Sequence, residues 1–486
     1  MLQAARTAGI GITLALACAA SAQAAPVLVL KHGHVTVRHE RFAGVSDLPV
    51  AAPAKAPQVS AARAHAAKAP KGRATRNALD ALLASGAIDQ RTHDADRASI
   101  NNALRTYRKL SGTRKTQLGA VIDNADAIAA AANLTPSRLP AIFATIDANN
   151  EWWSTGPLLS YGKRVSVGDS PLVWQYYPGQ GIQLQMLGNW SKANGLFQAH
   201  KTNDLRDMVD ALVPLAADRG GWPAWEYYFR FGGGSPPWTS SISQGTAIQA
   251  LARAGQRLQD PSLWELAKRA ETAFQTGPPA GVRDATPNGA FYLIYSYAPS
   301  QLVINAHLQA TIGLFDLAKI TGDPAAQALF QQGDAESRAV LNGYDTGHWS
   351  LYDQHTESDL SYHQLVTGFL ENLCKRTQTA LYCDTADRFN SYTKEPPQVT
   401  PTTRRIRTGR PARLGFSLDK VSRVGMVVAR GGRTVLSTSA TVGHGRRFFR
   451  WSRPASPGLY RFTVRATDLA GNRSDPETVT LRITKR

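Results

Sequence analysis

Most of the chain carries the hydrophobic pattern of amphipathic helices. Apolar residues recur at three- and four-residue spacing through residues 76–150, which is the period of an α-helix with one buried face. From about residue 170 to 395, helical segments alternate with loops rich in glycine, proline and aromatic residues. These segments form four successive pairs: GIQLQMLGNWSKANGLF with DLRDMVDALVPLAA, SQGTAIQALARAGQRL with PSLWELAKRAETAFQT, LVINAHLQATIGLFDLAKIT with PAAQALFQQGDAESRAVLNG, and SYHQLVTGFLENLCKR with ALYCDTADRFNSY. Four antiparallel pairs of similar length predict a helical repeat or an α/α toroid of hairpins rather than a simple bundle.

Two other parts of the chain carry the two-residue period of β-strands. Residues 26–45, PVLVLKHGHVTVRHERFAGV, alternate apolar and polar positions and predict a strand pair. Residues 397–486 contain short segments of this kind, such as RVGMVVAR and LYRFTVRATD, at turn-marked intervals, which predicts a small β-sandwich. The stretch SPGLYRFTVRATDLAGNRS resembles the last hairpin of an immunoglobulin-like or fibronectin-III-like module. The expected fold is therefore mainly α: an α/α toroid of helical hairpins, followed by a small all-β sandwich domain.

The first 24 residues have the composition of a secretory signal peptide. Arg6 precedes the apolar run AGIGITLALACAA, and Ala22, Gln23 and Ala24 provide a small-residue cleavage site. No later segment is apolar for long enough to cross a membrane. We therefore expect the mature chain to be secreted or associated with the cell envelope, without an integral membrane segment.

Shifts in composition divide the rest of the chain. Residues 25–75 combine the short β segment with a linker dominated by Ala, Pro, Lys and Arg, which has little to bury. We expect an N-terminal helical region at 76–150, the toroid at 151–396 and the sandwich at 397–486.

The charge is concentrated in the last ninety residues. The whole chain carries a formal charge of +19, and residues 397–486 hold 19 Lys and Arg against 4 Asp and Glu, a difference of +15. A field of this sign favours an anionic polymer or surface as partner; the alternative is that the arginines only keep the domain soluble. Arginine and aromatic residues are not arranged as in a nucleic-acid-binding module, so no nucleic-acid partner is expected.

Cysteine usage fits export. Cys18 lies in the expected signal peptide, which leaves Cys374 and Cys383 in CKRTQTALYC. Two cysteines nine residues apart in an oxidising compartment predict one disulfide that closes a short loop, with two free thiols as the alternative. Neither cysteine has the spacing or the histidine neighbours of a zinc site.

One stretch is unusually rich in groups that titrate or donate hydrogen bonds. Residues 346–365, TGHWSLYDQHTESDLSYHQL, hold three His, two Tyr and a Trp among Asp, Glu, Ser and Thr, and few residues that could build a core. Four of them could be imagined as metal ligands: Asp353, His355, Asp359 and His363. Their spacing fits no standard metal template, so no metal and no cofactor are expected.

Several motifs, taken in order, resemble a known family. PPWTSSISQGTAIQALARA, YSYAPSQLVINAHLQATIGLFDLAKITGD, LNGYDTGHWSLYD and SYHQL follow the C-terminal catalytic region of the D-glucuronyl C5-epimerases, enzymes that act on heparosan-type polysaccharide. The likeness covers about residues 150–395. It implies an α/α toroid and inversion at C5 of a hexuronic acid inside a polymer chain.

That reaction explains what such a polar stretch could supply. One group must remove the weakly acidic C5 proton, and another must return a proton from the opposite face. Donors must meanwhile stabilise the charge that develops on the sugar carboxylate. A tyrosine can act as the base only if a nearby cation or donor lowers its pKa from about 10.

The resemblance assigns catalytic tyrosines by motif. The family's IYD tyrosine corresponds to Tyr352 in SLYD, and its DYH tyrosine to Tyr362 in SYHQL, beside His363. A third tyrosine lies ten residues before the Asn of the family's VLNG, which gives Tyr295 when counted back from Asn305.

The chain departs from the family pattern near the third tyrosine. With a small gap, Tyr297 takes the place of Tyr295. The family has a Glu directly before this tyrosine. In this chain the position holds Ile294 if the tyrosine is Tyr295, and Ser296 if it is Tyr297. Each candidate also has a structural alternative: the tyrosines could pack between helices, and His363 could face water.

Other residues could bind the sugar. In WPAWEYYFR, Trp225 could stack on a sugar ring and Arg230 could bind its carboxylate, with core packing as the alternative for the tryptophan. Gln244 and Asn305 are candidates for sugar contacts or helix caps, and Tyr297 for a substrate contact.

Three functions follow from the sequence. The first is an exported C5-epimerase of hexuronic acid residues (D-glucuronate to L-iduronate) in an anionic polysaccharide. The second is a polysaccharide lyase, which removes the same proton and then expels the group at C4. The third is a non-catalytic polysaccharide-binding protein, which the missing Glu favours. The oligomeric state is open, with a homodimer as one option.

Overall fold

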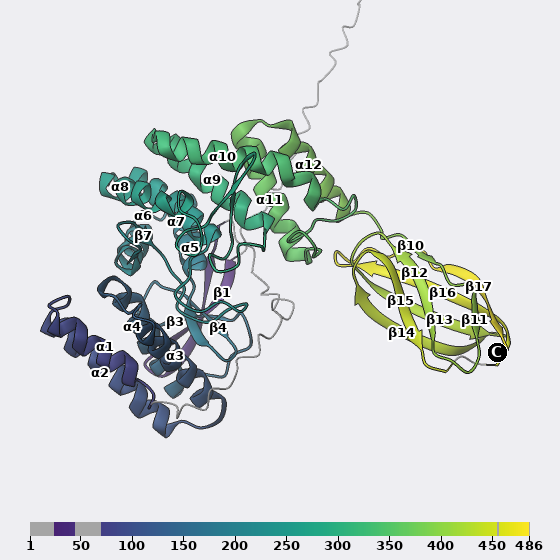
Figure 1. Cartoon of the computed structure of the whole chain (residues 1–486), viewed down its shortest axis with the longest axis horizontal. Coiled ribbons are helices and arrows are strands. Elements are labelled where there is room, and N and C mark those ends of the chain that lie inside the picture. Colours follow the sequence, from purple (N-terminus) through teal and green to yellow (C-terminus); the bar gives the residue numbers. More distant parts are fainter. Residues whose placement is uncertain (1–23, 44–69, 454–455, 486) are drawn as a thin grey trace, which may run out of the picture.

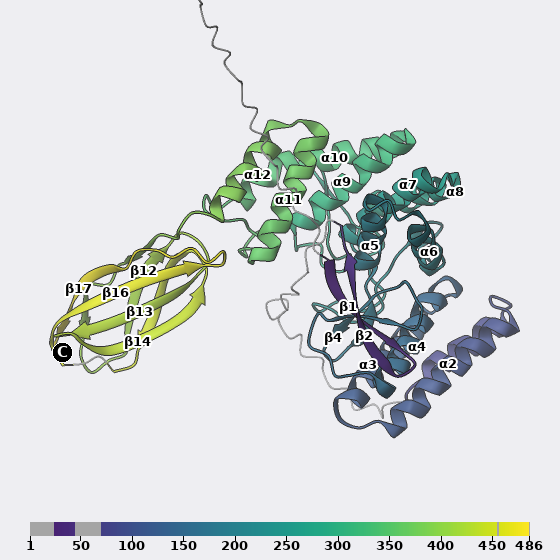
Figure 2. The same cartoon turned by 180° about the vertical axis from the view of Figure 1, so that it is seen from behind.

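The computed structural model describes residues 24–43, 70–453 and 456–485. Residues 1–23 of the predicted signal peptide and residues 44–69, most of the predicted linker, lie outside this part of the chain. Within it there are twelve α-helices and several β-sheets, so the mainly helical class is confirmed. Figures 1 and 2 show a large helical body, with the C-terminal strands in a separate elongated body beside α11 and α12. No described helix is long and apolar enough to cross a membrane.

The first helices form a layer of their own at one end of the helical body (Figure 1). They are α1 (Arg73–Ala84), α2 (Gln90–Lys109), α3 (Gly112–Ala130) and α4 (Leu139–Thr155). Their apolar stripes face one another, and Ile100, Ile122 and Ile146 are fully buried between them. Asp89 starts α2 because its side chain accepts a hydrogen bond from the Thr92 amide.

The strand pair expected near the N-terminus exists, but it is part of a larger sheet. The sheet order is β2-β1-β3-β4-β5. Its strands are β1 (Ala24–Lys31), β2 (His34–Arg41), β3 (Arg164–Val167), β4 (Trp174–Tyr177) and β5 (Gly181–Leu184). Strand β1 pairs in parallel with β3, more than 130 residues further along the chain. Because Val27 and Leu30 are fully buried, this pairing ties the N-terminal strands to the main body.

The four predicted helical pairs follow one another along the chain. They are α5 (Met186–Gln198) with α6 (Thr202–Leu212), α7 (Ser241–Leu258) with α8 (Pro261–Ala270), α9 (Ile304–Thr321) with α10 (Pro324–Val340), and α11 (Leu360–Thr377) with α12 (Ala380–Tyr392). The first helices of successive pairs, called here the inner helices, contact each other in the order α5, α7, α9, α11. A closed toroid stays a prediction.

Glycines allow the inner helices to approach closely. A Cβ on Gly313 of α9 would overlap with the carbonyl of Gly245 in α7, so only glycine fits at this crossing. The second helices of two pairs begin in the same way: Asp260 and Asp323 accept hydrogen bonds from backbone amides of α8 and α10, and a proline follows each of them. This order is the usual one, because proline has no amide to leave unpaired at the first helical position.

The C-terminal strands form two sheets around a common core. The three-stranded sheet has the order β10 (Val399–Pro401), β12 (Ala412–Leu418) and β15 (Gly445–Trp451). The five-stranded sheet has the order β11 (Arg405–Arg407), β17 (Glu477–Thr484), β16 (Gly458–Asp468), β13 (Ser422–Arg430) and β14 (Arg433–Val442). Alternate residues of both sheets, such as Phe416 and Phe462, point inward and are fully buried. Membership of an immunoglobulin-like or fibronectin-III-like class stays a prediction.

Specific polar contacts join this body to the helices. The Lys420 ammonium is 1% exposed; it donates to the carbonyls of Tyr392 and Glu395 and pairs with Asp468 at 3.3 Å. On the other side, the Glu357 carboxylate accepts hydrogen bonds from the amides of Val421 at 2.8 Å and of His444 at 2.7 Å. The C-terminal body therefore holds the loop that contains Tyr352.

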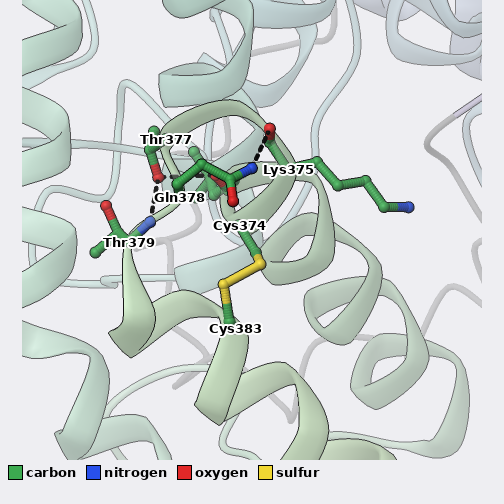
Figure 3. The surroundings of a disulfide bond; sticks show 7 residues. Cys374, Lys375, Thr377, Gln378, Thr379 and Cys383 are labelled. Atoms are coloured by element: carbon green, nitrogen blue, oxygen red, sulfur yellow. Dashed lines mark hydrogen bonds between the residues drawn. A yellow bond between two sulfur atoms is a disulfide. The ribbon is translucent and has the colours of Figure 1, made fainter.

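The predicted disulfide is confirmed. Cys374 in α11 and Cys383 in α12 are bonded and link the two helices of the last pair (Figure 3). The turn between the helices contains Gln378 in the left-handed conformation, whose amide bonds to the Cys374 carbonyl.

We expect the double variant Cys374→Ala and Cys383→Ala to lose about 2–3 kcal/mol of unfolding free energy, because the nine-residue separation closes only a short loop in the unfolded chain. Urea unfolding with and without a reducing agent measures this loss. The reducing agent should destabilise the wild type and leave the double variant unchanged. Equal sensitivity of both proteins would contradict the assignment.

Candidate active site

A pocket lies at the N-terminal ends of the four inner helices. It is bordered by the first turns of α5, α7, α9 and α11 and by the loops that lead into them. The lining residues are Gln175, Tyr177, Gln185, Leu187, Tyr227, Phe229, Phe231, Trp238, Ser240, Ile242, Ile294, Tyr295, Asn305 and Tyr362. Most are aromatic or neutral and polar. Among the described residues that line the pocket, none carries a formal charge.

Helix ends give this neutral pocket its electrostatic character. The N-terminus of a helix carries a positive partial charge and amides without intrahelical partners. Gln185 and Asp359 cap α5 and α11 with their side chains. Helices α7 and α9 follow Ser240 and Val303, neither of which makes a side-chain cap. The N-termini of α7 and α9, which have no side-chain cap, favour a negatively charged ligand group such as a carboxylate, whereas the Asp359 carboxylate offsets the positive end of α11.

Three of the predicted tyrosines meet at this pocket. Tyr295 precedes α9, Tyr352 precedes α11, and Tyr362 lies in the first turn of α11. The ring centroids of Tyr352 and Tyr362 are 4.7 Å apart, and the side chains of Tyr295 and Tyr362 lie close enough to Tyr352 to influence its pKa. Tyr295 and Tyr362 line the pocket, and Tyr352 is electrostatically coupled to both. Residues far apart in the sequence thus form one cluster.

Burial controls the protonation of this cluster. It raises the pKa of Tyr352 to about 12, against the effect of the neighbouring Tyr295 and Tyr362, which lower it; the carboxylates of Asp353 and Asp359 raise it further. Burial also raises the pKa values of Tyr295 and Tyr362, and a charge on Tyr352 would raise both further. All three are therefore protonated donors at neutral pH. A tyrosine base needs a nearby cation or hydrogen-bond donor, and among the described lining residues hydroxyl and amide groups can fill this role.

His363 follows Tyr362 but lies in the core rather than in the pocket. Its ring stacks on Trp349 with centroids 3.8 Å apart. Its Nε2 lies 2.9 Å from the Phe389 carbonyl, and since a carbonyl only accepts, Nε2 carries the hydrogen. Its Nδ1 then accepts from the Ser350 hydroxyl at 2.8 Å. Both nitrogens are occupied, so the position of His363 supports a structural role, not a catalytic one.

We expect His363 to lower the folding stability of the protein as the pH falls below about 6.5. Burial lowers its pKa from 6.5 to about 4 in the folded state. Because the unfolded chain then binds the proton more tightly, stability that is complete above about pH 6.5 is lost as the pH falls toward about 4. His363→Gln keeps a donor but cannot be protonated, so its Tm should drop less than the wild-type Tm in calorimetry between neutral pH and about pH 5.

The control for this measurement is His355→Gln, which changes an exposed loop histidine. It should follow the wild type at every pH. A Tm difference between the wild type and His363→Gln that does not vary with pH would contradict the prediction.

The predicted sugar-binding residues do not all reach the pocket. Trp225 is fully buried: its ring packs edge-on against Trp190 and its indole N–H donates to the Leu212 carbonyl. The Gln244 side chain is also buried, and its Oε1 accepts a hydrogen bond from the Trp225 amide. The position of Trp225 therefore supports packing rather than contact with a sugar; Gln244 does not line the pocket either, although its Nε2 is buried without a partner among the described residues. Arg230 is exposed and lies between two residues of the pocket lining.

Two other candidates present polar atoms without partners. The Oδ1 atom of Asn305 in α9 is buried, lines the pocket and has no hydrogen-bond partner among the described residues. The Tyr297 hydroxyl is also buried without a partner; Tyr297 does not line the pocket, but its ring stacks on that of the lining residue Tyr295, with centroids 5.2 Å apart. A buried polar atom without a partner costs free energy, so both atoms are candidates for ligand contacts.

A hydrogen-bond network that includes several residues of the pocket lining was not predicted from the sequence. The Tyr227 hydroxyl lies 2.6 Å from the Ser243 hydroxyl and donates to Gln185 Oε1 at 3.2 Å. The amides of Gln175 and Gln185 donate to the Tyr177 hydroxyl at 3.2 and 3.3 Å. The signal was the segment WQYYPGQGIQLQ, in which polar residues alternate with apolar ones although β4 and β5 are buried on both faces.

A buried ion pair anchors the segment that contains Tyr227. Glu226 precedes Tyr227 and is fully buried. The Arg138 guanidinium donates to both of its oxygens, at 2.7 and 3.1 Å, and Arg219 lies 3.3 Å away. The Tyr228 hydroxyl donates to it as well. Glu226 thus ties the aromatic segment to the N-terminal helical region.

The fold and pocket define a class: a protein of consecutive helical hairpins with a tyrosine cluster at the N-termini of its inner helices. Residues 219–391 match the family described as the D-glucuronyl C5-epimerase C-terminus. The resemblance predicted from the motifs is therefore confirmed for this part of the chain. A D-glucuronyl C5-epimerase of Caenorhabditis elegans is 29% identical over 208 residues, which are 38% of this chain and 34% of that protein. The chain thus spans about a third of the length of this relative.

Similarity to solved structures is weaker. The cellobiose 2-epimerase of Spirochaeta thermophila is 13% identical, with a TM-score of 0.35 over 54% of this chain and 70% of that chain. An unsaturated glucuronyl hydrolase specific for heparin is 11% identical, with a TM-score of 0.30 over 74% of this chain and 93% of that chain.

Proposed function

We propose that this chain is a carbohydrate epimerase that inverts C5 of hexuronic acid residues in an anionic polysaccharide. The observation that carries the proposal is the cluster of Tyr295, Tyr352 and Tyr362, which come from three family motifs and meet at one pocket. Export is part of the proposal, and a disulfide suits an oxidising compartment.

The pocket suits the carboxylate of such a sugar. As the C5 proton leaves, negative charge spreads onto this carboxylate and must be stabilised by fixed donors. The N-termini of α7 and α9, which have no side-chain cap, provide a positive potential at the pocket. Proton transfer is assigned to Tyr295 and Tyr362, which line the pocket. In the reacting state one of them is a phenolate that takes the C5 proton, while the other is protonated and returns a proton from the opposite face. The proton gained by the first can then pass to the second through Tyr352, which is electrostatically coupled to both.

A non-catalytic binding protein is the second candidate, and one observation favours it. Ile294 lines the pocket at a position where the family has Glu, and the described lining contains no carboxylate. A pocket of protonated tyrosines and amides could hold a sugar without removing a proton. A lyase shares the first step with an epimerase, so the same experiment must separate all three.

The experiment is proton exchange in heavy water. The purified mature chain is incubated with uronic acid polysaccharides, heparosan first, and deuterium at C5 is measured by NMR while ultraviolet absorbance of unsaturated uronates is followed. Deuterium without new absorbance, lost in Tyr362→Phe, supports the epimerase. Growing absorbance identifies a lyase. Binding without exchange identifies a binding protein.

A further inference from the structure

One face of the C-terminal body combines arginines with an exposed aromatic ring. Along β12, Leu414, Phe416 and Leu418 point into the core, so Arg413 and Gly415 point outward. Residues paired directly across an antiparallel ladder share a face. In the register with β15, Arg413 is opposite Arg450 and Gly415 is opposite Phe448.

Arg446 lies on the same face, two residues before Phe448. The four side chains Arg413, Arg446, Phe448 and Arg450 are exposed and are called here the basic sheet face. It extends for about 13 Å along β15, which is enough to contact more than one sugar residue.

The aromatic ring distinguishes this face from the rest of the body. Phe448 is 48% exposed and is the one aromatic among the large exposed hydrophobic residues that the structure describes between 397 and 485. The Arg413 guanidinium lies over its ring, 4.5 Å from the centroid. Its chain neighbour Phe449 points inward and packs on Phe416. An exposed ring held by a cation leaves its other side available for stacking.

The charges of this face are not neutralised within the protein. Residues 397–486 contain four carboxylates. Asp468 pairs with Lys420, and Asp419 lies near His348. Within the described part of this segment, no arginine makes an ion pair with a carboxylate. Like charges directly opposite across two strands, as in Arg413 and Arg450, are destabilising, so an anion bound between them would relieve repulsion.

We propose that the basic sheet face binds an anionic polysaccharide, with uronate carboxylates on the guanidinium groups and a sugar ring on Phe448. Guanidinium groups suit carboxylates because they donate two parallel hydrogen bonds. The apolar face of a sugar ring can pack on an aromatic ring. The choice of this polymer rests on the proposed function, since the pocket and this face would then hold parts of one substrate. The face would retain the polymer and raise its local concentration at the pocket.

The test measures binding of heparosan to the full mature chain by calorimetry at low and at physiological salt. The double variant Arg446→Ser and Arg450→Ser should bind about tenfold more weakly, and Phe448→Ser should also weaken binding. The matched control is Arg461→Ser with Arg465→Ser. It removes the same charge from two exposed arginines on the outer face of the other sheet and should change binding by less than about threefold.

Equal losses in the two double variants would overturn the proposal, because net charge alone would then explain binding. Tighter binding of a DNA oligonucleotide than of heparosan would overturn it in favour of a nucleic-acid surface. Failure of the proposed function gives a different result: Tyr362→Phe and the wild type would both lack C5 exchange, while the face variants would still lose binding. Exchange on a short oligosaccharide should survive in the face variants, since the pocket is intact.

Discussion

Replacing Tyr352 with phenylalanine is expected to slow C5 proton exchange about 10²–10⁴-fold, the usual range for loss of a proton-transfer group. Tyr352 packs against Tyr362 and is electrostatically coupled to both Tyr295 and Tyr362, the two tyrosines of the pocket lining. Its loss removes the connection between them, so a phenolate formed in the pocket has no neighbour that can share its charge. The ring, which packs on Tyr362, is retained, so the fold and the binding of polysaccharide should be preserved. The rate is measured as deuterium incorporation by NMR.

The control is Tyr107→Phe, which removes the hydroxyl of a tyrosine on α2, far from the pocket lining. This variant should exchange at the wild-type rate. If Tyr352→Phe retains more than about a tenth of the wild-type rate, the connecting role of Tyr352 is wrong. Tyr295 and Tyr362 would then act without it.

Replacing Glu226 with glutamine is expected to lower the unfolding free energy by about 3–5 kcal/mol, because removing one partner leaves buried charge without compensation. Glu226 is fully buried and faces both Arg138 and Arg219. Glutamine has the same shape but cannot neutralise either guanidinium. The segment that follows Glu226 contributes Tyr227 and Phe229 to the pocket, so binding should weaken together with stability. Urea unfolding followed by circular dichroism measures the change.

The matched control is Glu265→Gln on α8. Glu265 forms an exposed pair with Lys268, and exposed pairs contribute at most about 1 kcal/mol. If both variants are destabilised to the same small extent, Glu226 does not hold the segment in the way described. If Glu226→Gln is destabilised but binds polysaccharide with unchanged affinity, the ion pair stabilises the fold without determining the shape of the pocket.

Residues of the polar stretch 346–365 lie in three different environments, although its composition predicted a single catalytic loop. Tyr352 and Tyr362 belong to the tyrosine cluster. Trp349 and His363 stack inside the core. Glu357 joins the loop to the C-terminal body through backbone amides. Composition alone predicted a functional stretch, but it could not distinguish these positions, since each needs the same kinds of side chain.

The sequence by itself determined the local elements. The helical period identified the four hairpins, the alternation in 397–486 identified its strands, and two cysteines nine residues apart predicted the disulfide. These features depend on neighbours within about twenty residues, and hydrophobic period, caps and loop length encode them directly. The motifs also selected three tyrosines that lie in one cluster.

Tertiary structure decided what each side chain faces. The parallel pairing of β1 with β3 and the wall built by Gln175 and Tyr177 join segments whose sequences carry no mark of their partners. Tyr362 and His363 show the reason most clearly. Successive residues of an α-helix point about 100° apart, so one step along α11 turns from the pocket to the core. Which of the two directions is the pocket depends on where the other inner helices lie, and that is settled only when the chain has packed.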